Sequence, residues 1–302
     1  MKAAIIVNPT SGRIDYLDRL TWMEDELVRH GFQVTVRTTS APLEAIELAR
    51  RASGEGSELV ISVGGDGTLN EVINGISLSR SRLGIIPVGL SNVLARELGI
   101  PADPEAALRI ITAGHTRRID LGSANGRLFS IMISIGLDAE AVRIVSSSLK
   151  KYLKRYAYHL AGLKALISFR PPPFTVIVDG ERELLGRAAV ISNARFYGGP
   201  HRITPDARVD DGYLHCCLFE KGSRRDYARY FWGVLRKKHH TFSDVTLIKA
   251  RQVRIDTPGL PIQADGDYIG YTPIRIQLLP KQLTVLVPSP ETNKTRSSSS
   301  NK

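Results

Sequence analysis

Short runs of apolar, mostly β-branched residues alternate with helical patterns over the first 120 residues. Runs typical of buried strands occur at residues 3–7, 34–36, 59–63 and 83–87. Amphipathic patterns with helical spacing occur at residues 17–29, 43–51, 69–76 and 92–98. This alternation predicts a parallel sheet covered by helices, and residues 117–122 form the strand expected to leave it.

The pattern changes from about residue 123 onward, where short β-rich segments follow one another. They lie at residues 128–135, 174–178, 188–192, 213–219, 245–248, 253–256, 274–278 and 283–287. Turn dipeptides such as Asp179-Gly180 and Pro258-Gly259 separate several of them. The pattern predicts an antiparallel β-sandwich. We therefore expect an α/β domain over 1–122 and a β-sandwich domain over 123–282. The final strand, near 283–288, is expected to return to the first domain.

Two helices are predicted within the β-rich part, at residues 148–169 and 224–237. The first carries Lys150, Lys151, Lys154 and Arg155 on one side and apolar residues on another. It fits a basic helix resting on an anionic membrane, or a helix docked on the core with a solvated basic face. The cluster 236–240 is also basic. Residues 291–302 are polar and Ser-rich, which predicts disorder.

The charge balance favours an anionic partner. The chain has 302 residues and a net charge of +11, with 41 Lys and Arg against 30 Asp and Glu. Nucleotides and anionic membranes fit this excess, whereas no zinc-finger, basic helix-turn-helix or aromatic-rich sheet pattern indicates nucleic acid. No apolar run is long enough for a membrane span. The two cysteines, Cys216 and Cys217, are adjacent, so a cytoplasmic setting is expected.

The most informative segment is a Gly-rich loop directly after the predicted strand 59–63. It reads Gly64-Gly65-Asp66-Gly67-Thr68-Leu69-Asn70-Glu71. Glycines let backbone N–H groups approach an anion, and a helix beginning near Thr68 would direct its positive end at the same place. Asp66 would repel phosphate unless a divalent cation lay between them. The loop predicts a nucleotide-phosphate site with Mg²⁺; the alternative is a tight turn in which Asp66 caps a helix.

A second loop of small residues follows the first predicted strand. It reads Asn8-Pro9-Thr10-Ser11-Gly12. Ligands of open α/β sheets gather at the carboxyl ends of the strands, so both loops are expected to face one ligand. Their convergence favours phosphate binding over two unrelated turns.

Together with later motifs, these loops resemble the catalytic domain of the diacylglycerol kinase family, which includes bacterial soluble lipid kinases and sphingosine kinases. The matching segments are 8–12, 64–71, Asn92 with Ala95-Arg96, Asp120 before Gly122, 205–213 and Asp265-Gly266-Asp267. The Gly-Gly-Asp-Gly loop alone also resembles NAD kinases and phosphofructokinases. The ordered series, which extends to about residue 288, points to the diacylglycerol kinase family.

The resemblance implies a phosphofructokinase- or NAD-kinase-like α/β domain followed by a β-sandwich, with ATP-dependent phosphorylation of a lipid hydroxyl. The residues expected to contact ATP are Asn8, Pro9, Thr10, Ser11, Gly12, Thr39, Gly64, Gly65, Asp66, Gly67, Thr68, Leu69, Asn70, Glu71, Ser91 and Asn92. It also implies that Asp66 and Asp120 hold a catalytic Mg²⁺ network. Asp265 resembles the general base, and Asp267 stands where the family usually has Glu.

A second, structural Mg²⁺ site is also implied by the resemblance. Its ligands would be the main-chain carbonyls of Arg208 and Tyr213 and the side chain of Asp211. Residue patterns alone leave plainer alternatives open. Asp211-Gly212 and residues 265–267 also fit turns, and Asp120 also fits a cap on neighbouring N–H groups.

Two residues depart from the family pattern Gly-Thr-x-Asn-Asp, because this chain has Gly89-Leu90-Ser91-Asn92-Val93. Leu90 cannot donate a hydrogen bond to phosphate. Ser91 could donate it instead if the loop were shifted. Val93 removes a carboxylate from the metal network, as in sphingosine-kinase-like relatives. Losing one hydrogen bond to a charged group costs about 1.5–3 kcal/mol, so slower transfer is expected.

The expected function is an ATP- and Mg²⁺-dependent kinase for a diacylglycerol-like or sphingoid lipid, active in phospholipid metabolism at an anionic membrane surface. We expect a cytoplasmic, peripherally attached protein, with a homodimer paired through an edge strand as the oligomer to consider. One alternative is a kinase for a soluble substrate such as NAD, which rests on the Gly-rich loop alone. The other is a catalytically weak or inactive lipid-binding relative, which Leu90 and Val93 motivate.

Overall fold

The computed structural model describes residues 1–11, 19–144 and 169–289 of the chain. It divides into two compact units, Met1–Ile119 with Lys281–Lys302, and Asp120–Pro280. Strands β5 (Thr116–Ala124) and β18 (Ile274–Leu286) contribute residues to both units. Gly12, the predicted basic helix at 148–169 except its last residue, and the tail 291–302 lie outside the described residues.

The first unit contains a parallel sheet whose order is β2-β1-β3-β4, joined at β4 by the end of β18. Its strands are β1 (Lys2–Val7), β2 (Gln33–Thr38), β3 (Leu59–Gly64) and β4 (Arg82–Pro87). All six residues of β3 and the last five of β1 are buried, as expected for strands covered on both faces. Val63 pairs with Val7 on one side and with Ile86 on the other. The carboxyl ends of these strands therefore lie at the same edge.

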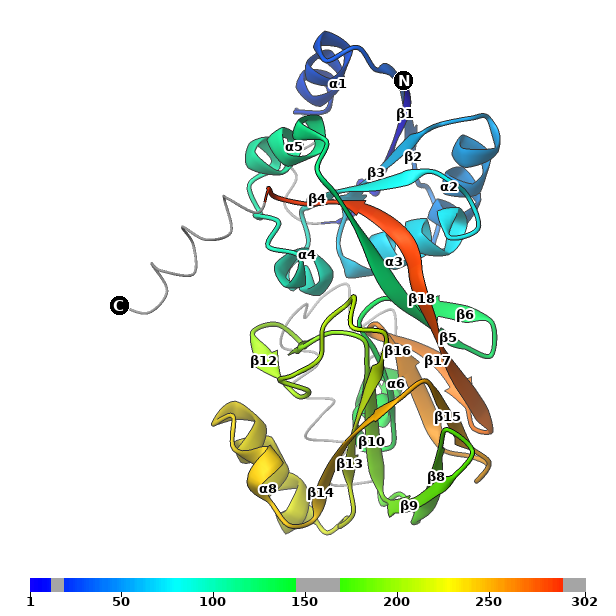
Figure 1. The fold of residues 1–302 in the computed structure, drawn as a ribbon, viewed down its shortest axis with the longest axis vertical. Coiled ribbons are helices and arrows are strands. Elements are labelled where there is room, and N and C mark those ends of the chain that lie inside the picture. The colour runs from blue at the N-terminus through cyan, green and yellow to red at the C-terminus, as the bar shows by residue number, and fades with distance from the viewer. Residues whose placement is uncertain (12–18, 145–168, 290–302) are drawn as a thin grey trace. The chain divides into compact units, whose positions relative to one another are not determined.

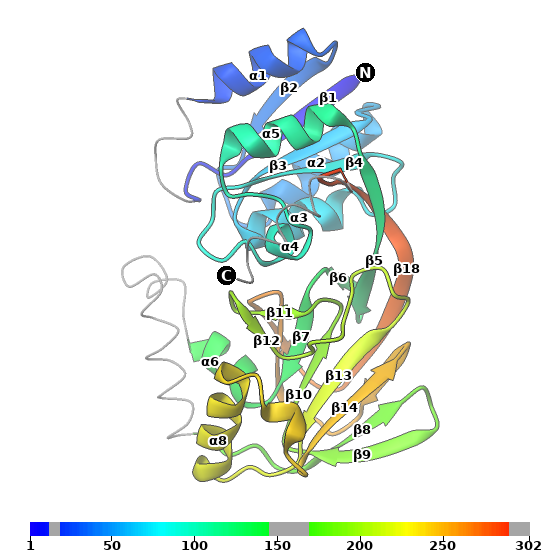
Figure 2. The same ribbon diagram turned by 60° about the vertical axis from the view of Figure 1, so that its left-hand side comes forward.

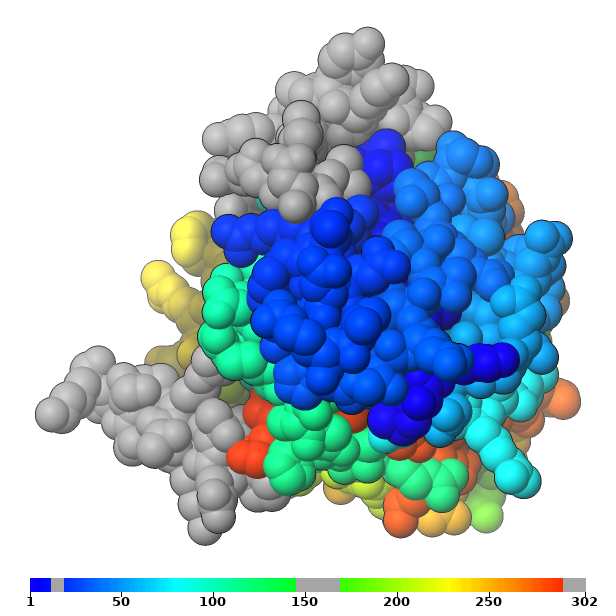
Figure 3. Space-filling model, turned by 90° about the horizontal axis from the view of Figure 1, so that it is seen from above, coloured from blue at the N-terminus to red at the C-terminus, as the bar shows by residue number. Residues whose placement is uncertain are grey.

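Helices cover both faces of this sheet (Figure 1). Helices α1 (Leu20–Arg29) and α5 (Pro104–Ala113) lie on one face, while α2 (Glu44–Gly54) and α3 (Asp66–Ile76) pack together on the other (Figure 2). Figure 3 shows α1 in blue and α5 in teal at the surface of the unit. The α/β architecture predicted from the alternation of strand and helix is confirmed.

Helix α5 was missed by the sequence analysis, although it carries clear start and stop signals. The Asp103 side chain accepts a hydrogen bond from the N–H of Ala106 at 2.8 Å, and Pro104 occupies the first turn. Gly114 ends the helix with φ = 76°, a conformation that favours glycine. These caps, more than the apolar spacing, identify the helix.

Within the described residues, the second unit contains two larger antiparallel sheets and a two-stranded one. The first has the order β14-β13-β10-β7-β16-β17. Its strands are β7 (Met132–Ile135), β10 (Ala188–Ser192), β13 (Leu214–Phe219), β14 (Val245–Ala250), β16 (Pro261–Ala264) and β17 (Asp267–Tyr271). The second sheet is built from β18, β15 (Gln252–Ile255), β8 (Phe174–Val178) and β9 (Arg182–Gly186). Strand β5 pairs with β18, and β6 (Arg127–Phe129) pairs with β5.

One apolar core joins the two sheets of this unit. Phe129, Phe174, Val176, Ile191 and Ile276 all belong to it and are at most 2% exposed. Side chains from both sheets therefore interlock in one layer, which confirms the predicted antiparallel β-sandwich.

Shorter elements complete the second unit, namely α6 (Leu137–Ile144), β11 (Phe196–Tyr197), β12 (His201–Arg202), α8 (Arg224–Leu235) and the 3₁₀ turn η2 (His239–Thr241). The helix predicted at 224–237 is α8. Within the described part of the chain, none of the helices is both long and apolar enough to span a membrane.

Two strand predictions were wrong in detail. The apolar run 128–135 forms two strands, because the backbone N–H groups of residues 130–132 bond to a side chain instead of continuing one ladder. The runs 274–278 and 283–287 are parts of the single strand β18, which continues through the polar residues between them.

Candidate active site

The loop after β1 contacts the start of α3 at the carboxyl edge of the parallel sheet. Asn8 Nδ2 donates to Thr68 Oγ1 at 3.0 Å, and Ser11 Oγ lies 3.5 Å from the same hydroxyl oxygen. Asn8 Oδ1 in turn accepts hydrogen bonds from the N–H and hydroxyl of Thr10 at 3.0 and 2.8 Å. The two segments predicted to face one ligand, 8–12 and 64–71, are thus brought together within the first unit through residues 8 and 11 of the first segment.

Glycines allow a third loop, the one after β4, to approach the same place. A Cβ atom on Gly89 would lie 2.6 Å from Gly65 Cα, and one on Gly64 would lie 2.5 Å from Thr68 Cβ. Gly67 differs, since a Cβ atom there would meet nothing within 4 Å. Gly89 therefore allows the loops after β3 and β4 to pack closely, Gly64 leaves room for the Thr68 side chain, and Gly67 leaves open space beside its backbone.

Asp66 begins α3 and also holds the loop after β4. Its Oδ1 accepts a hydrogen bond from the N–H of Val93 at 2.6 Å, at the start of α4 (Val93–Glu97). Asn92, with φ = 46°, closes the preceding turn through both Gly89 N–H (3.0 Å) and Gly89 carbonyl (2.8 Å). Asp66 therefore makes the bond that the capping alternative requires, although to α4 instead of its own helix. Its metal role stays a proposal.

Other predicted ATP contacts support the loops from behind. Thr39 is 7% exposed, and its N–H donates to the Val7 carbonyl at 2.8 Å. Glu71 Oε2 accepts a hydrogen bond from the N–H of Ala45 at 3.2 Å, which links α3 to the start of α2. Leu69 and Asn70 are buried, at 5% and 4% exposure. Their positions suit a supporting role more than direct contact with a nucleotide.

Substituting three glycines would separate loop packing from phosphate approach. Gly89→Ala is expected to lower the unfolding free energy by about 1–3 kcal/mol, because the new methyl group meets backbone. Gly67→Ala should leave stability equal or raised by about 0.5–1 kcal/mol, yet raise the KM for ATP if phosphate approaches this backbone. Urea unfolding and ATP-dependent kinetics measure both. Gly54→Ala, at the end of α2 with open space around it, is the control. Equal KM values for all three variants would contradict the cradle.

Asp265, in the second unit, is enclosed by hydrogen-bond donors. Its Oδ2 accepts from the N–H and hydroxyl of Ser130 at 2.7 and 3.0 Å, and its Oδ1 from the N–H groups of Ile131 and Met132 at 3.0 and 2.9 Å. The residue has φ = 47°, in the left-handed region. Burial raises the pKa of the Asp265 carboxyl above its ordinary value, against the lowering effect of these bonds.

Asp267 has a more open setting, two residues further along the same turn. Its carboxylate is 38% exposed and lies 3.2 Å from Arg127 Nη2. The turn between the two aspartates is held from below, because Gln263 Oε1 accepts the N–H of Gly266 at 2.8 Å. The Asp265–Asp267 segment therefore forms a hairpin turn, one of the alternatives that its residue pattern left open. The Asp265 carboxylate is enclosed and the Asp267 carboxylate is accessible to solvent.

Asp120 and Asp211 meet around one loop of the second unit. Asp120 is 1% exposed, and its Oδ2 accepts the N–H of Gly212 at 2.8 Å. Asp211 Oδ1 accepts the N–H of Tyr213 at 3.1 Å, and its Oδ2 lies 2.8 Å from His215 Nε2. These bonds agree with the turn and capping alternatives for both aspartates. The Arg208 carbonyl accepts the N–H of Asp211 at 3.3 Å and so belongs to the same loop.

The donor chemistry fits Mg²⁺ at both predicted places. Among the residues that the structure describes, no three His, Cys, Asp or Glu side chains form a metal cluster. Mg²⁺ needs less than that, because it is commonly held by one or two carboxylates together with substrate phosphates and water. Asp66 provides such a carboxylate beside the open space at Gly67. Asp211 and its neighbouring carbonyls provide oxygen ligands of the same kind.

Sequence reasoning missed the donors that surround Asp265, namely Ser130, Ile131 and Met132. The available signal was Ser130, a polar residue inside the apolar run 128–135. It also missed the buried set beneath the turn, in which Gln263 Nε2 donates to Ser134 Oγ at 2.9 Å and to Asp138 Oδ2 at 3.2 Å.

Similarity to known proteins gives this geometry a family. Residues 2–124 match the diacylglycerol kinase catalytic domain, and residues 131–287 match the YegS C-terminal NAD kinase beta sandwich-like domain. The diacylglycerol kinase of Bacillus subtilis (strain 168) is 32% identical over 295 residues, covering 95% of this chain and 96% of that protein. The chain belongs to the diacylglycerol kinase family.

Other members of the diacylglycerol kinase family agree in sequence and fold. The diacylglycerol kinase of Staphylococcus carnosus (strain TM300) is 31% identical over 293 residues, 95% of each chain. The crystal structure of a putative diacylglycerol kinase from Bacillus anthracis str. Sterne aligns with a TM-score of 0.80 at 26% identity, over 96% of each chain. The predicted resemblance is confirmed, and it supports a kinase that acts on a lipid, at this general level.

Proposed function

We propose that the chain is an ATP- and Mg²⁺-dependent kinase that phosphorylates the hydroxyl of a diacylglycerol-like or sphingoid lipid at a membrane surface. The observation that carries the proposal is the convergence of the three loops after β1, β3 and β4 at the start of α3, which Asp66 begins. Phosphoryl transfer depends on positioning and on neutralising the charge of the phosphates, which N–H groups, a helix N-terminus and a cation provide together.

Within this proposal, the loop residues 8–11 and 64–67 bind the phosphates of ATP. Asp66 would hold the Mg²⁺ ion, with Asp120 as the second carboxylate of its network, and the ion would neutralise the oxygens of the transferred phosphoryl group. Asp211, with the carbonyls of Arg208 and Tyr213, would hold the structural ion and fix its loop.

We assign the proton acceptor to Asp267 and a positioning role to Asp265. Each oxygen of Asp265 already accepts two hydrogen bonds, which leaves it no lone pair for a lipid hydroxyl. Asp267 is 38% exposed next to Arg127, so its carboxylate is open to solvent, and in this proposal it receives the substrate. In the reaction, the lipid hydroxyl oxygen bonds to the γ-phosphorus, the bond to ADP breaks, and the hydroxyl proton passes to Asp267.

A radiolabel transfer assay tests the function. Purified protein is incubated with γ-labelled ATP, Mg²⁺ and mixed micelles containing diacylglycerol, monoacylglycerol, ceramide or a sphingoid base, with NAD as a soluble acceptor. Label in one lipid, lost on chelation of Mg²⁺, is the expected result. Label in NAD alone, or in none of the acceptors beside a working control kinase, would contradict the proposal.

Leu90 and Val93 favour one second candidate, a weak or inactive lipid-binding relative. Leu90 is 77% exposed where the family pattern has a phosphate-binding threonine, and Val93 offers only its N–H to Asp66. Leu90→Thr separates the two possibilities. A slow kinase is expected to gain about tenfold in turnover from the restored hydrogen bond, whereas a protein without ATP affinity in calorimetry would gain nothing.

The proposal extends to a peripheral place on an anionic membrane, which the excess positive charge supports. It also includes a homodimer paired through an edge strand of the second unit, for which β14 and β17 end the six-stranded sheet. Light scattering at several protein concentrations tests the dimer directly.

A further inference from the structure

Helix α8 presents two large aromatic side chains to solvent. Phe231 is 61% exposed and Trp232 is 58% exposed, and their ring centroids lie 6.4 Å apart in an edge-to-face arrangement. The opposite side of the helix is buried through Tyr227, Tyr230 and Gly233. Because the inward side already has its apolar contacts, the outward aromatic pair is not needed to attach the helix to the sandwich.

Basic residues surround this aromatic pair. The segment 221–240 contains seven Lys and Arg and one Asp, a net charge of +6 out of +11 for the whole chain. The exposed basic residues are Lys221, Arg224, Arg225, Arg236, Lys237 and Lys238. Helical spacing places Arg224 seven residues before Phe231 and Arg225 seven before Trp232, on the same side. The Arg236 guanidinium lies 5.7 Å from the Trp232 ring centroid.

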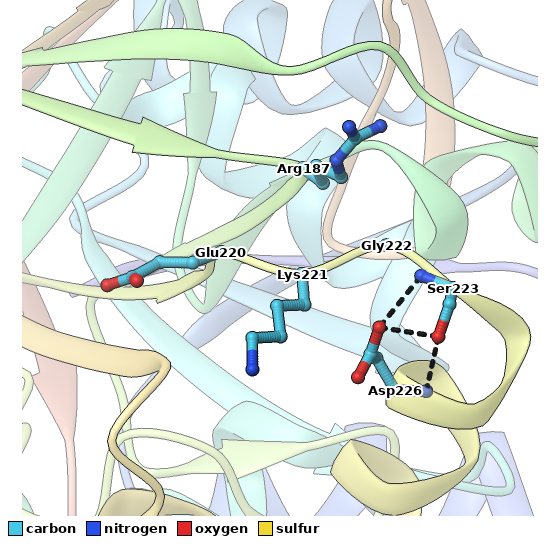
Figure 4. Close-up of a pocket in the computed structure, with 6 residues that line it drawn as sticks. All are labelled: Arg187, Glu220, Lys221, Gly222, Ser223 and Asp226. Carbon is cyan, nitrogen blue, oxygen red and sulfur yellow. Dashed lines mark hydrogen bonds between the residues drawn. The ribbon is translucent and has the colours of Figure 1, made fainter.

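The rest of the unit holds α8 firmly in this orientation. Tyr230 hydroxyl donates to Asp244 Oδ2 at 2.9 Å, Arg229 pairs with the same carboxylate, and the Tyr230 and Phe219 rings are 4.7 Å apart. At the other end, Ser223 and Asp226 form a reciprocal capping box (Figure 4). The face is therefore preformed, and binding through it would need no folding of the helix.

A hollow of about 470 Å³ lies beside the capping box and is lined by Arg187, Glu220, Lys221, Gly222, Ser223 and Asp226 (Figure 4). It is a poor anion site, because the Asp226 carboxylate already accepts the N–H of Ser223 at 3.0 Å and adds negative charge there. The outward face of α8 is therefore a better candidate for a binding surface than this hollow.

We propose that the outward face of α8, formed by Phe231 and Trp232 with the exposed basic residues of 221–238, docks on an anionic lipid bilayer. Insertion of Trp and Phe at the boundary between headgroups and acyl chains lowers the free energy of binding. Electrostatic attraction between the surrounding Lys and Arg and anionic headgroups lowers it further. An acidic protein or nucleic acid would use the charges but would leave the two adjacent aromatic rings without an apolar medium. Charge and apolar character together select the membrane.

This inference rests on the proposed function, because a kinase for a bilayer lipid needs a surface that meets the bilayer. It is tested without ATP, so that it can fail separately. If kinase activity on lipid in detergent micelles is found while vesicle binding through α8 is not, the function stands and the surface is wrong. If the protein binds vesicles through α8 but shows no kinase activity, the assigned surface stands and the proposed function is wrong.

Trp232 itself reports the contact. The chain has two tryptophans, so Trp22→Phe leaves Trp232 as the only one. With vesicles of phosphatidylglycerol and phosphatidylcholine, we expect a blue shift of its emission and quenching by lipids brominated near the headgroup. Vesicles of phosphatidylcholine alone and buffer with 1 M NaCl should remove most of the signal. Vesicle binding with no shift and no quenching of Trp232 would overturn the proposal, as would an absence of binding.

Charge and aromatic variants of the full chain complete the test by vesicle flotation. Arg224→Glu/Arg225→Glu and Phe231→Ser/Trp232→Ser are each expected to weaken partitioning at least about tenfold. The control Arg50→Glu/Arg51→Glu changes the net charge equally on α2, and Leu185→Ser removes a comparably exposed apolar residue from β9. Thermal unfolding confirms that each variant folds. Equal losses in controls and α8 variants would show a general charge or solubility effect and overturn the assigned surface.

Discussion

Asp66→Asn is expected to lower turnover by at least roughly 10³-fold while the protein remains folded, because removing one group that stabilises transition-state charge has effects of this order. Asparagine keeps an Oδ1 atom, so the 2.6 Å hydrogen bond from Val93 N–H can persist. The charge that would hold Mg²⁺ is lost, and raising the Mg²⁺ concentration should not restore full turnover. Labelled ATP transfer to lipid in micelles measures the effect.

The control for Asp66→Asn is Asp25→Asn, an exposed aspartate on α1 in the same unit. Both variants should keep the unfolding free energy within about 1 kcal/mol of the parent, as expected when no buried polar group is left unpaired. A normal turnover number for Asp66→Asn, with folding intact, would reduce the residue to a cap for α4 and remove the central element of the proposed mechanism.

Asp265→Asn and Asp267→Asn are expected to fail in different ways. In Asp265→Asn, an NH₂ group replaces one carboxylate oxygen and faces two donors, so at least two charge-assisted hydrogen bonds are lost. At about 1.5–3 kcal/mol for each bond, the unfolding free energy should fall by about 3 kcal/mol or more. Asp267→Asn loses a half-exposed ion pair, worth less than about 1 kcal/mol, but should lower turnover by roughly 10²–10⁴-fold.

Urea unfolding and kcat measured on the same preparations separate the two roles. Asp256→Asn is the matched control, because Asp256 forms a comparable exposed pair with Arg254 at 3.1 Å in the same unit. The opposite outcome would be an unchanged kcat in Asp267→Asn and no measurable turnover in an Asp265→Asn variant that is as stable as the parent. That outcome would return the proton-acceptor role to Asp265.

The capping role and the metal-binding role predicted for Asp66 and Asp120 are compatible. Asp66 makes a capping bond to Val93, and Asp120 makes one to Gly212. Each bond fixes the carboxylate in one orientation, and a fixed carboxylate loses less entropy when it binds a cation. Hydrogen bonds of this kind are therefore compatible with the proposed metal-binding role.

The periodicity of the sequence was sufficient for the fold class. Strands covered on both faces are continuously apolar, as in 59–63, and alternation of strands with helices favours parallel pairing. Both properties can be recognised from residues that are close together in the sequence. The Gly-rich loop and the order of the motifs were equally local. Boundaries were less accurate, because α5 depends on its caps and β6 and β7 are divided by bonds to a distant residue.

The sequence by itself determined the two kinds of domain, the loops proposed to bind phosphate and the carboxylates available for chemistry. Only the tertiary structure decided which aspartate of the 265–267 turn is enclosed, which N–H group Asp66 holds, and which side of α8 faces solvent. These depend on residues as far apart as 130 and 265, or 66 and 93, and on which apolar side chains the core has room to bury. The local sequence pattern identifies the candidate residues, and long-range packing determines the contacts and exposure of each.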